Sequence, residues 1–501
     1  MIEVETKSLP PETKILGTKY VFKTKYKNGI YDKRKARLVV MGHKQIPGLH
    51  FNPAEIFSPV AAIQTGRCVL SMTATKGWYI RHSDVQSAFV QAPLHDELYI
   101  NLPKGMPTTN ANGNQIAYKL LTSLYGIRQA PRVWYNLVNK TLLAMQFTMS
   151  QVEPCLFTKN VNTDKAIIIV LIVDDLIETS PDETILLNFE IEFKKVFTLG
   201  STGPIDWWNG IKVIYNQQTC TITLNQRAHI DQLLLRFNMT ECIPIATPTD
   251  PSIKLIPATE EELLTTTDKT IYQSIVGGLM YIACTVNPAI QFAVNQCASY
   301  MASPGTSHLI AAKRILRYLK GNSNIVLCYS PSNTHNQILI PYSDASWGGE
   351  IHDARSITGT CILLNGAAVS WQSKRQQTTA LSSTEAEYMA ITETAKTLSF
   401  LTILCKDIGI IQPRPLPIYS DNQSAIQITG NPVSSLRTRH INIRHHFIKE
   451  KVIEGDIIVL FVPTASMLAD ILTKSLTKGP FIQIRDAIHG IATWSFPKET
   501  N

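Results

Sequence analysis

Two adjacent carboxylates, Asp174 and Asp175, interrupt an apolar stretch of the chain. The run AIIIVLIV at 166–173 has the length and composition of a buried strand, and Leu176 and Ile177 resume the apolar pattern. An Asp pair in a turn has an ordinary explanation, because Asp tolerates turn conformations. Between packed strands, however, two like charges about 4 Å apart cost on the order of 4 kcal/mol at an effective dielectric of about 20. A divalent cation removes that repulsion, so the pair predicts a metal site.

Two Mg²⁺ ions held about 3.5 to 4 Å apart need at least one further carboxylate, and this arrangement supports in-line attack on a phosphorus atom. Asp84, in HSDVQSAFVQAPL, is the best candidate because it ends an apparent strand in the same part of the chain. The alternative interpretation of Asp84 is a helix N-cap. The three acids together predict chemistry at phosphorus.

The composition is that of a folded protein with a basic surface. With 501 residues, 44% hydrophobic and 17% charged, the chain has room for about three domains and is too apolar to be mainly disordered. Its formal charge of +8 fits a polyanionic partner but is also common in proteins without one. The nine cysteines lack the spacing of a zinc site and are expected to be reduced core residues of an intracellular protein. We expect neither a signal peptide nor a membrane anchor.

The acids must be positioned by elements that the pattern of residues predicts. Strand-forming pieces between Tyr20 and Val40 flank Asn28-Gly29, a strong hairpin signal, and indicate a basic hairpin. Three elements are expected after it: a helix over 64–78, a strand followed by a turn and a short helix over 79–94, and a helix over 131–147.

Residues 240–270, rich in Pro, Thr and acidic side chains, are predicted to be a linker. Helices are expected over 271–286 and 307–321. The second helix carries a basic stripe that would either follow a phosphate backbone or form a solvated face: Lys313, Arg314, Arg317 and Lys320.

From residue 337 the pattern alternates between strands and helices, which predicts a mixed sheet flanked by helices. The expected order is a strand over 338–346, a hairpin over 359–373, a helix over 383–405, a strand over 416–424 and a final helix over 466–476. Two of the strands end in nearly the same letters, YSDA and YSDN.

In this order the motifs resemble the Pol region of Ty1/copia-type retrotransposons. Five blocks are similar to the reverse transcriptase: KARLVVMGHKQ (35–45), EIFSPVAAIQTGR (55–67), SDVQSAFVQAPL (83–94), SLYGIRQAPRVWY (123–135) and VDDL (173–176). Six more are similar to the connecting region and ribonuclease H: YQSIVGGLMYIA, AAKRILRYLKG, YSDASW, ALSSTEAEYMA, YSDNQSA and LADILTK. So many ordered matches leave little room for chance.

The resemblance implies an α/β (α+β) architecture, with a right-hand polymerase of fingers, palm and thumb before a ribonuclease H-like mixed-sheet domain. The expected boundaries are 1–240 for fingers and palm, 241–330 for the linker and the helical thumb or connection, 331–480 for the ribonuclease H-like domain and 481–501 for a C-terminal tail. The implied activities are RNA-directed DNA polymerase and cleavage of the RNA in RNA-DNA hybrids. Each active site would use two Mg²⁺ ions, or Mn²⁺ in their place.

The same resemblance assigns roles around the first site. It implies that the palm metal ligands are Asp84, Asp174 and Asp175. Lys35 and Arg37, two apart on a strand and thus on one face, match positions that grip the incoming triphosphate. Phe89 matches an aromatic residue that excludes nucleotides with a 2′-hydroxyl. Arg128 matches a position that contacts phosphate. Without the resemblance, a basic hairpin edge and a core aromatic residue are the alternatives.

The second site depends on acids from three elements. Asp344 and Asp421 each end an apolar strand, where a turn would bring them together. Glu385 and Glu387 are two positions apart on the predicted helix and cannot share a face. Glu387 is in line with the packed stripe and is predicted to point inward. The family pattern adds Asp470, which completes a set of four ligands, although each acid alone also fits a cap or a surface position.

The expected partners are an RNA template, a DNA primer, RNA-DNA hybrid and dNTPs, and no membrane. A homo- or hetero-oligomer with other polyprotein products is also expected. His440, His445 and His446 are expected to be structural or to face the substrate. The resemblance implies a cytoplasmic, virus-like particle, with the nucleus as an alternative location. The chain is expected to be the C-terminal part of a Pol polyprotein or a truncated copy. The alternative functions are an inactive or co-opted fragment that only binds nucleic acid and a ribonuclease H alone.

Overall fold

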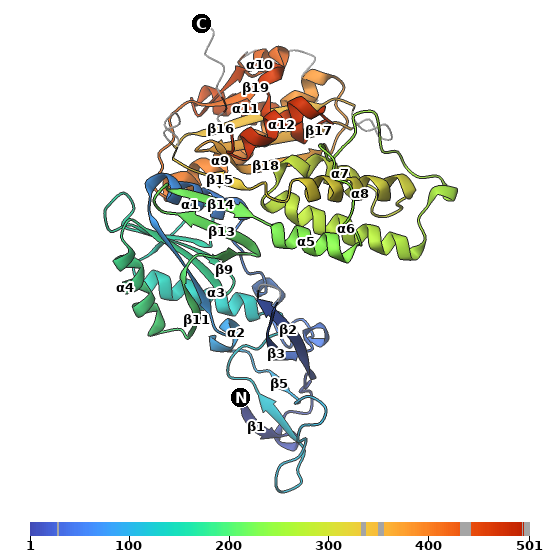
Figure 1. The fold of residues 1–501 in the computed structure, drawn as a ribbon. Helices are drawn as coiled ribbons and strands as arrows, with labels where there is room; N and C mark the ends of the chain where they lie inside the picture. The colour runs from blue at the N-terminus through green and yellow to red at the C-terminus, as the bar shows by residue number, and fades with distance from the viewer. Residues whose placement is uncertain (28–29, 332–336, 349–354, 431–441, 493, 495–501) are drawn as a thin grey trace. The chain divides into compact units, whose positions relative to one another are not determined.

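The computed structural model describes residues 1–27, 30–331, 337–348, 355–430, 442–492 and 494, which form a mixed α/β structure with several sheets (Figure 1). The chain packs into two compact units: an N-terminal unit of residues 1–61 and 81–204, and a C-terminal unit of residues 62–80 and 205–501. The motif-based boundaries at 240 and 330 do not coincide with this division. Among the described residues, no helix combines the length and the apolar character needed to cross a membrane.

A six-stranded sheet forms the core of the N-terminal unit, in the order β11-β4-β10-β9-β8-β7. Its strands are β4 (Tyr79–Val85), β7 (Thr148–Met149), β8 (Leu156–Lys159), β9 (Ile167–Ile172), β10 (Asp175–Ser180) and β11 (Leu199–Pro204). The apolar run forms β9, which is buried over 167–171 and pairs antiparallel with β10. Asp174 lies in the turn between these two strands, and Asp175 is the first residue of β10. The two acids therefore stand at the tip of an apolar hairpin.

Three helices accompany this sheet: α2 (Ala88–Gln91), α3 (Ala130–Ala144) and α4 (Glu183–Lys194). Helix α4 packs against β10. Helix α3 begins with a proline in its first turn, where the missing N–H is tolerated. Its buried residues recur at helical spacing, which is why one face packs inward: Ala130, Trp134, Tyr135, Val138 and Leu142.

The predicted basic hairpin is formed by β2 (Thr18–Lys27) and β3 (Ile30–Val40), and its Asn28-Gly29 turn lies outside the described residues. In the antiparallel register Lys23 pairs with Lys35 and Val21 pairs with Arg37, so Lys35 and Arg37 share a face. A separate three-stranded sheet has the order β1-β6-β5, with β1 (Ile2–Glu5), β5 (Tyr99–Ile100) and β6 (Ile116–Lys119).

Gly126 allows the hairpin to dock on the loop that precedes α3. The N–H of Val40, at the end of β3, donates to the carbonyl of Tyr125 over 2.8 Å. Gly126 has a φ of +97°, and a Cβ there would lie 2.2 Å from the carbonyl oxygen of Val40. Only glycine meets both conditions without strain.

The C-terminal unit contains a four-stranded sheet in the order β12-β13-β14-β15 and several helices. Their bounds are β12 (Trp207–Trp208), β13 (Ile211–Asn216), β14 (Thr221–Asn225), β15 (Leu327–Tyr329), α1 (Ile63–Lys76), α5 (Arg227–Arg236), α6 (Thr266–Thr285), α7 (Gln291–Ala298) and α8 (Thr306–Gly321). The helices expected over 64–78, 271–286 and 307–321 correspond to α1, α6 and α8.

Helix α1 belongs to this unit because its polar residues are bonded inside it. The guanidinium of Arg67 donates to the carbonyls of Cys284 and Thr285, over 3.2 and 3.1 Å, and stacks 3.7 Å from the ring of Trp371. Burial lowers the pKa of Arg67 to about 10. These bonds fix α1 against α6 and the strand that carries Trp371.

The basic stripe on α8 anchors the predicted linker. Three of its cations donate to main-chain carbonyls over 2.8 to 3.2 Å: Arg314 to Thr249, Arg317 to Ile243 and Lys320 to Cys242. These three side chains thus hydrogen-bond the segment 242–249 of their own chain. Neither sequence-based interpretation of the stripe, a phosphate-binding face or a solvated face, included this role.

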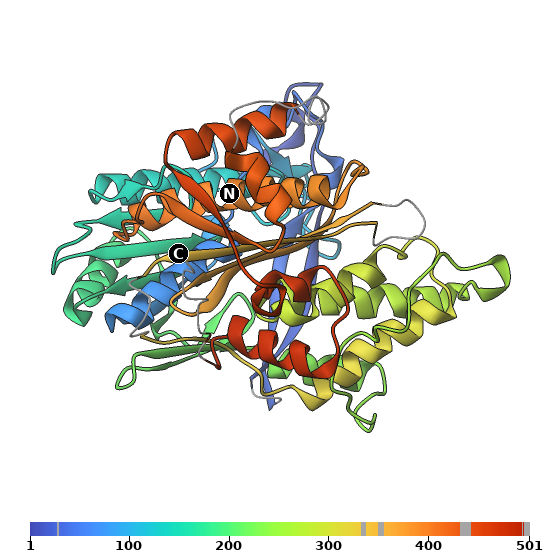
Figure 2. The same ribbon diagram turned by 90° about the horizontal axis from the view of Figure 1, so that it is seen from above.

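A five-stranded mixed sheet follows, in the order β18-β17-β16-β19-β20, and is drawn in yellow-orange to red in Figures 1 and 2. Its strands are β16 (Leu339–Ser346), β17 (Ile357–Leu364), β18 (Ala367–Arg375), β19 (Leu416–Ser420) and β20 (Ile457–Phe461). Strands β16, β17 and β18 pair antiparallel, whereas β16, β19 and β20 pair parallel. The long helix α9 (Ser383–Asp407) packs on β16, β17 and β19. The remaining helices are α10 (Gln423–Gly430), α11 (Asn442–Ile453) and α12 (Lys478–Ile488).

The prediction of a helix over 466–476 is wrong. The segment instead forms two short 3₁₀ turns, η7 (Thr464–Ser466) and η8 (Leu468–Leu472). Every residue of η8 is buried, and its backbone approaches β17 so closely that a Cβ on Gly359 would lie 2.9 Å from the carbonyl of Ala469. Packing onto the sheet overrides the helical propensity of these residues.

Two candidate carboxylate sites

The first site lies where the β9–β10 turn meets β4. The carbonyl of Asp174 accepts a hydrogen bond of 2.7 Å from the N–H of Val85, the residue after Asp84. Burial raises the pKa of Asp174, and the negative charges of Asp175 and Asp84 raise it further. The three predicted acids therefore share one electrostatic environment.

Two residues that the sequence analysis did not select complete this site. His82 lies two residues before Asp84, and its Nε2 is 3.0 Å from Oδ1 of Asp175. Burial lowers the pKa of His82, but the hydrogen bond and the charge of Asp175 outweigh it, so the pKa lies above its ordinary value. A Cβ on Gly200, in the neighbouring strand β11, would lie 2.5 Å from Oδ2 of Asp84. A glycine inside a strand often marks a close approach of another group, so Gly200 could have been found from the sequence on this ground.

Phe89 and Arg37 approach the first site through Tyr125. The rings of Phe89 and Tyr125 lie 5.1 Å apart, edge to face, and the guanidinium of Arg37 lies 5.2 Å from the centre of the Tyr125 ring. The charge of Arg37 also lowers the pKa of Asp174, against the larger effect of burial. The Nε of Arg37 is buried without a hydrogen-bond partner.

Arg128, the fourth residue predicted to bind nucleotide, is engaged by its own chain. Its Nε donates to the carbonyl of Gly42 over 3.2 Å, and its guanidinium lies 5.5 Å from the ring centre of Phe51. Its predicted contact with phosphate stays a prediction.

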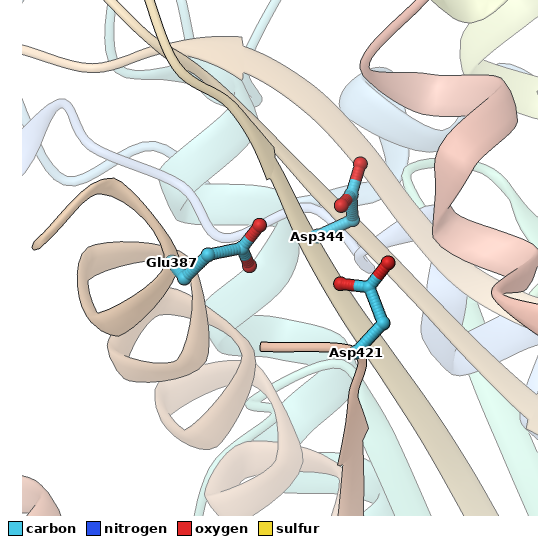
Figure 3. Close-up of side chains that lie close together, drawn as sticks. All are labelled: Asp344, Glu387 and Asp421. Atoms are coloured by element: carbon cyan, nitrogen blue, oxygen red, sulfur yellow. The ribbon is translucent and has the colours of Figure 1, made fainter. Parts of the chain in front are cut away.

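The second site brings together acids from three elements (Figure 3). Oxygen atoms of Asp344, Glu387 and Asp421 all lie within 4.8 Å of one another. Tyr342 of β16 pairs in parallel with Tyr419 of β19. Asp344 and Asp421 each follow two residues after these tyrosines, and residues at equal offsets on parallel strands are neighbours. Helix α9 adds Glu387 from the side, whereas Glu385 is half-buried and accepts a hydrogen bond from the N–H of Leu381.

Burial and mutual repulsion dominate the electrostatics of this cluster. Burial, followed by the charges of Asp344 and Asp421, raises the pKa of Glu387 to about 9. Burial and the charge of Asp344 raise the pKa of Asp470 to about 7. The pKa of Asp344 is also raised, mainly by burial and against the charge of Lys474.

Three residues outside the predicted set hold these carboxylates in place. The hydroxyl of Thr473 donates to Oδ2 of Asp344, and that of Thr464 donates to Oδ2 of Asp421 over 2.8 Å. The ammonium of Lys474 lies 2.8 Å from Oδ1 of Asp470. The spacing of Asp470 and Lys474, four apart, was a signal for this pair, but nothing in the sequence indicates the two threonines.

The second site fits a divalent metal by the chemistry of its donors. Mg²⁺ prefers oxygen ligands, and Glu387 presents a buried Oε2 that has no hydrogen-bond partner. Among the described residues, the group Asp344, Glu387 and Asp421 alone brings three such ligands within 4.8 Å. The carboxylates of the first site are more widely spaced, and Asp175 is drawn toward His82.

The structure does not test the expectation that three histidines face the substrate or are structural. His440 lies outside the described residues, and His445 and His446 belong to α11, where their side chains are not described.

Comparisons with known proteins identify the chain at the level of its family. The family described as reverse transcriptase (RNA-dependent DNA polymerase) matches residues 4–251. The chain is 36% identical over 479 residues to the retrovirus-related Pol polyprotein from transposon TNT 1-94 of Nicotiana tabacum, covering 94% of this chain and 35% of the relative. It is 37% identical over 474 residues to the Pol polyprotein from transposon RE1 of Arabidopsis thaliana, covering 94% and 31%. The putative transposon Ty5-1 protein YCL074W of Saccharomyces cerevisiae is 31% identical over 313 residues, 62% of this chain and 98% of that protein.

The class defined by these matches is that of the reverse transcriptases. The chain belongs to the reverse transcriptase family of Ty1/copia-type retrotransposons, as its motifs predicted. It spans 35% and 31% of the two plant polyproteins.

Proposed function

We propose that the chain is an RNA-directed DNA polymerase that also cleaves the RNA of RNA-DNA hybrids. The observation that carries the proposal is the family match together with two separate groups of acids, three around the β9–β10 turn and a tighter cluster formed by Asp344, Glu387 and Asp421. Under this proposal the N-terminal part acts as fingers and palm of a right hand, and the five-stranded mixed sheet acts as a ribonuclease H-like domain. The substrates are RNA template, DNA primer, dNTPs and hybrid.

The polymerase site uses its own residues for distinct tasks. Asp84, Asp174 and Asp175 would hold Mg²⁺, which when bound activates the primer hydroxyl and neutralises the leaving group. Lys35 and Arg37 bind the triphosphate from the hairpin, and this role is supported by the guanidinium of Arg37 over the Tyr125 ring and by the effect of its charge on Asp174. Phe89 blocks a 2′-hydroxyl, and this role is supported by its contact with Tyr125 beside Arg37.

The hybrid-cleaving site uses the second cluster. Asp344, Glu387, Asp421 and Asp470 would hold Mg²⁺ beside the scissile phosphodiester of the RNA strand. Thr473 and Thr464 keep two of these carboxylates oriented, and Lys474 balances the charge of Asp470.

Primer extension and hybrid cleavage in Mg²⁺ test both activities in one preparation. On poly(rA)/oligo(dT), Asp175→Asn should abolish extension and leave hybrid cleavage intact, whereas Asp421→Asn should do the reverse. Each variant is thus the folding control of the other. Hybrid binding by the wild type without extension or cleavage would instead support a fragment that only binds nucleic acid, and cleavage without extension a ribonuclease H alone.

A further inference from the structure

The residue before the first catalytic pair has an unusual backbone. Val173, in the turn between β9 and β10, has a φ of +60°. Non-glycine residues rarely adopt this left-handed conformation, and for a β-branched residue it is a clear outlier. Such a conformation persists only where the surrounding structure holds it, and outliers of this kind gather at functional sites.

Trp134 of α3 holds this turn from one side. Its indole Nε1 donates a hydrogen bond of 2.5 Å to the carbonyl of Val173. The indole is only 1% exposed, and it packs against the ring of Phe197 with centroids 5.2 Å apart. The donor is therefore itself fixed by packing.

The next carbonyl in the turn is bonded to a different element. The carbonyl of Asp174 accepts the 2.7 Å bond from Val85 of β4, the strand that carries Asp84. Two consecutive carbonyls are thus bonded to two different elements, α3 and β4. Because Asp174 follows Val173 directly, rotation of the Val173 peptide would redirect both carboxylates of the pair.

The surroundings make the indole bond hard to replace. A cavity of ≈ 510 Å³ lies beside the turn, and it is lined mainly by apolar side chains: Phe57, Val60, Phe89, Trp134, Leu171 and Val173. The two hydroxyls of its lining, those of Ser58 and Tyr135, already donate to the carbonyls of Pro131 and Pro154, so neither would replace the indole N–H without losing its own bond. A polar group left without its partner beside apolar side chains is destabilised.

We propose that Trp134 is a positioning residue of the polymerase site, which holds Val173 in its left-handed conformation so that the Asp174–Asp175 pair stays at the end of β4, next to Asp84. This inference rests on the proposed polymerase function. It concerns a hydrogen bond to the main chain, so it requires the indole N–H and not merely a large ring at position 134.

The test combines Trp134→Phe with Val173→Gly. Phenylalanine keeps an aromatic ring but removes the donor, and we expect kcat for primer extension to fall about tenfold or more, with KM for dNTP nearly unchanged and hybrid cleavage unaffected. Glycine adopts a positive φ without penalty. In a Val173→Gly background, Trp134→Phe should therefore cause a clearly smaller loss of kcat than in the wild type.

Tyr135→Phe is the matched control. Tyr135 is the neighbouring buried aromatic residue of α3, and its hydroxyl donates over 3.0 Å to the carbonyl of Pro154, which is not part of the β9–β10 turn. Loss of this bond should leave kcat unchanged. If Trp134→Phe lowers kcat equally in both backgrounds, the indole acts only through packing and the inference is wrong. If the wild type extends primers and Trp134→Phe extends them equally well, the inference alone fails, whereas a wild type that does not extend primers overturns the proposed function and the inference together.

Discussion

Glu387→Gln should stabilise the metal-free protein while it abolishes hybrid cleavage. Glutamine has nearly the shape of glutamate but never ionises, so it keeps the packing of α9 and removes the free-energy cost that burial and the charges of Asp344 and Asp421 impose on an acid at this position. The ordinary pKa of Glu387 is 4.5 and its pKa in the folded protein is about 9. The folded state therefore binds more protons than the unfolded state between these values, and the free energy of unfolding falls as pH rises through this window.

The size of the effect follows from the same shift. At pH 7, about 2.5 pH units above the ordinary pKa, the wild type loses about 3.5 kcal/mol of unfolding free energy relative to a variant with a neutral side chain, at about 1.4 kcal/mol per unit. For a unit of this size, that corresponds to a rise of roughly 5 °C in the unfolding midpoint of Glu387→Gln. The rise should vanish near the ordinary pKa, where glutamate is protonated in both states.

Thermal unfolding in EDTA between about pH 5 and pH 8 measures this difference directly. Saturating Mg²⁺ should reverse its sign, because the wild type gains binding energy from a carboxylate that the variant lacks. Glu385→Gln, two positions away and half-buried, is the control; glutamine keeps an oxygen for the N–H of Leu381, so this variant should leave the pH dependence of the midpoint and the cleavage unchanged. A stabilisation by Glu387→Gln that is the same at every pH, or absent at pH 8, would refute the electrostatic argument.

Two further predictions concern the N-terminal unit. Gly126→Ala should lower the free energy of unfolding by more than about 1 kcal/mol, because its Cβ would meet the carbonyl of Val40, whereas Gly113→Ala, also at positive φ but with no heavy atom within 4 Å, should lose less in the same denaturant titration. Equal losses would mean that backbone strain alone matters. Phe89→Ala should raise the incorporation of NTPs relative to dNTPs by about tenfold or more in single-nucleotide extension, with Val90→Ala as the control, and unchanged discrimination would remove Phe89 from sugar selection.

The sequence by itself determined the elements and the acids that end them. The apolar run and the Asp pair predicted the hairpin of β9 and β10 with carboxylates at its turn, and the structure has this arrangement. The helical period identified Glu387 as the inward residue of α9, where it is 5% exposed while Glu385 is only half-buried. These features depend on the periodicity of apolar residues, which can be read from the sequence and which predicts the buried face of each element.

Tertiary structure alone decided which distant groups meet. His82 contacts Asp175, Thr473 bonds Asp344, and Arg67 joins α1 to the C-terminal unit beneath Trp371. The same reason explains the wrong helix over 466–476, since its backbone packs onto β17 at Gly359. Hydrogen bonds to main-chain carbonyls, such as those made by Trp134 and the basic stripe of α8, leave no mark in the sequence of the acceptor, because every residue carries the same carbonyl. Such contacts exist only once packing has brought the segments together.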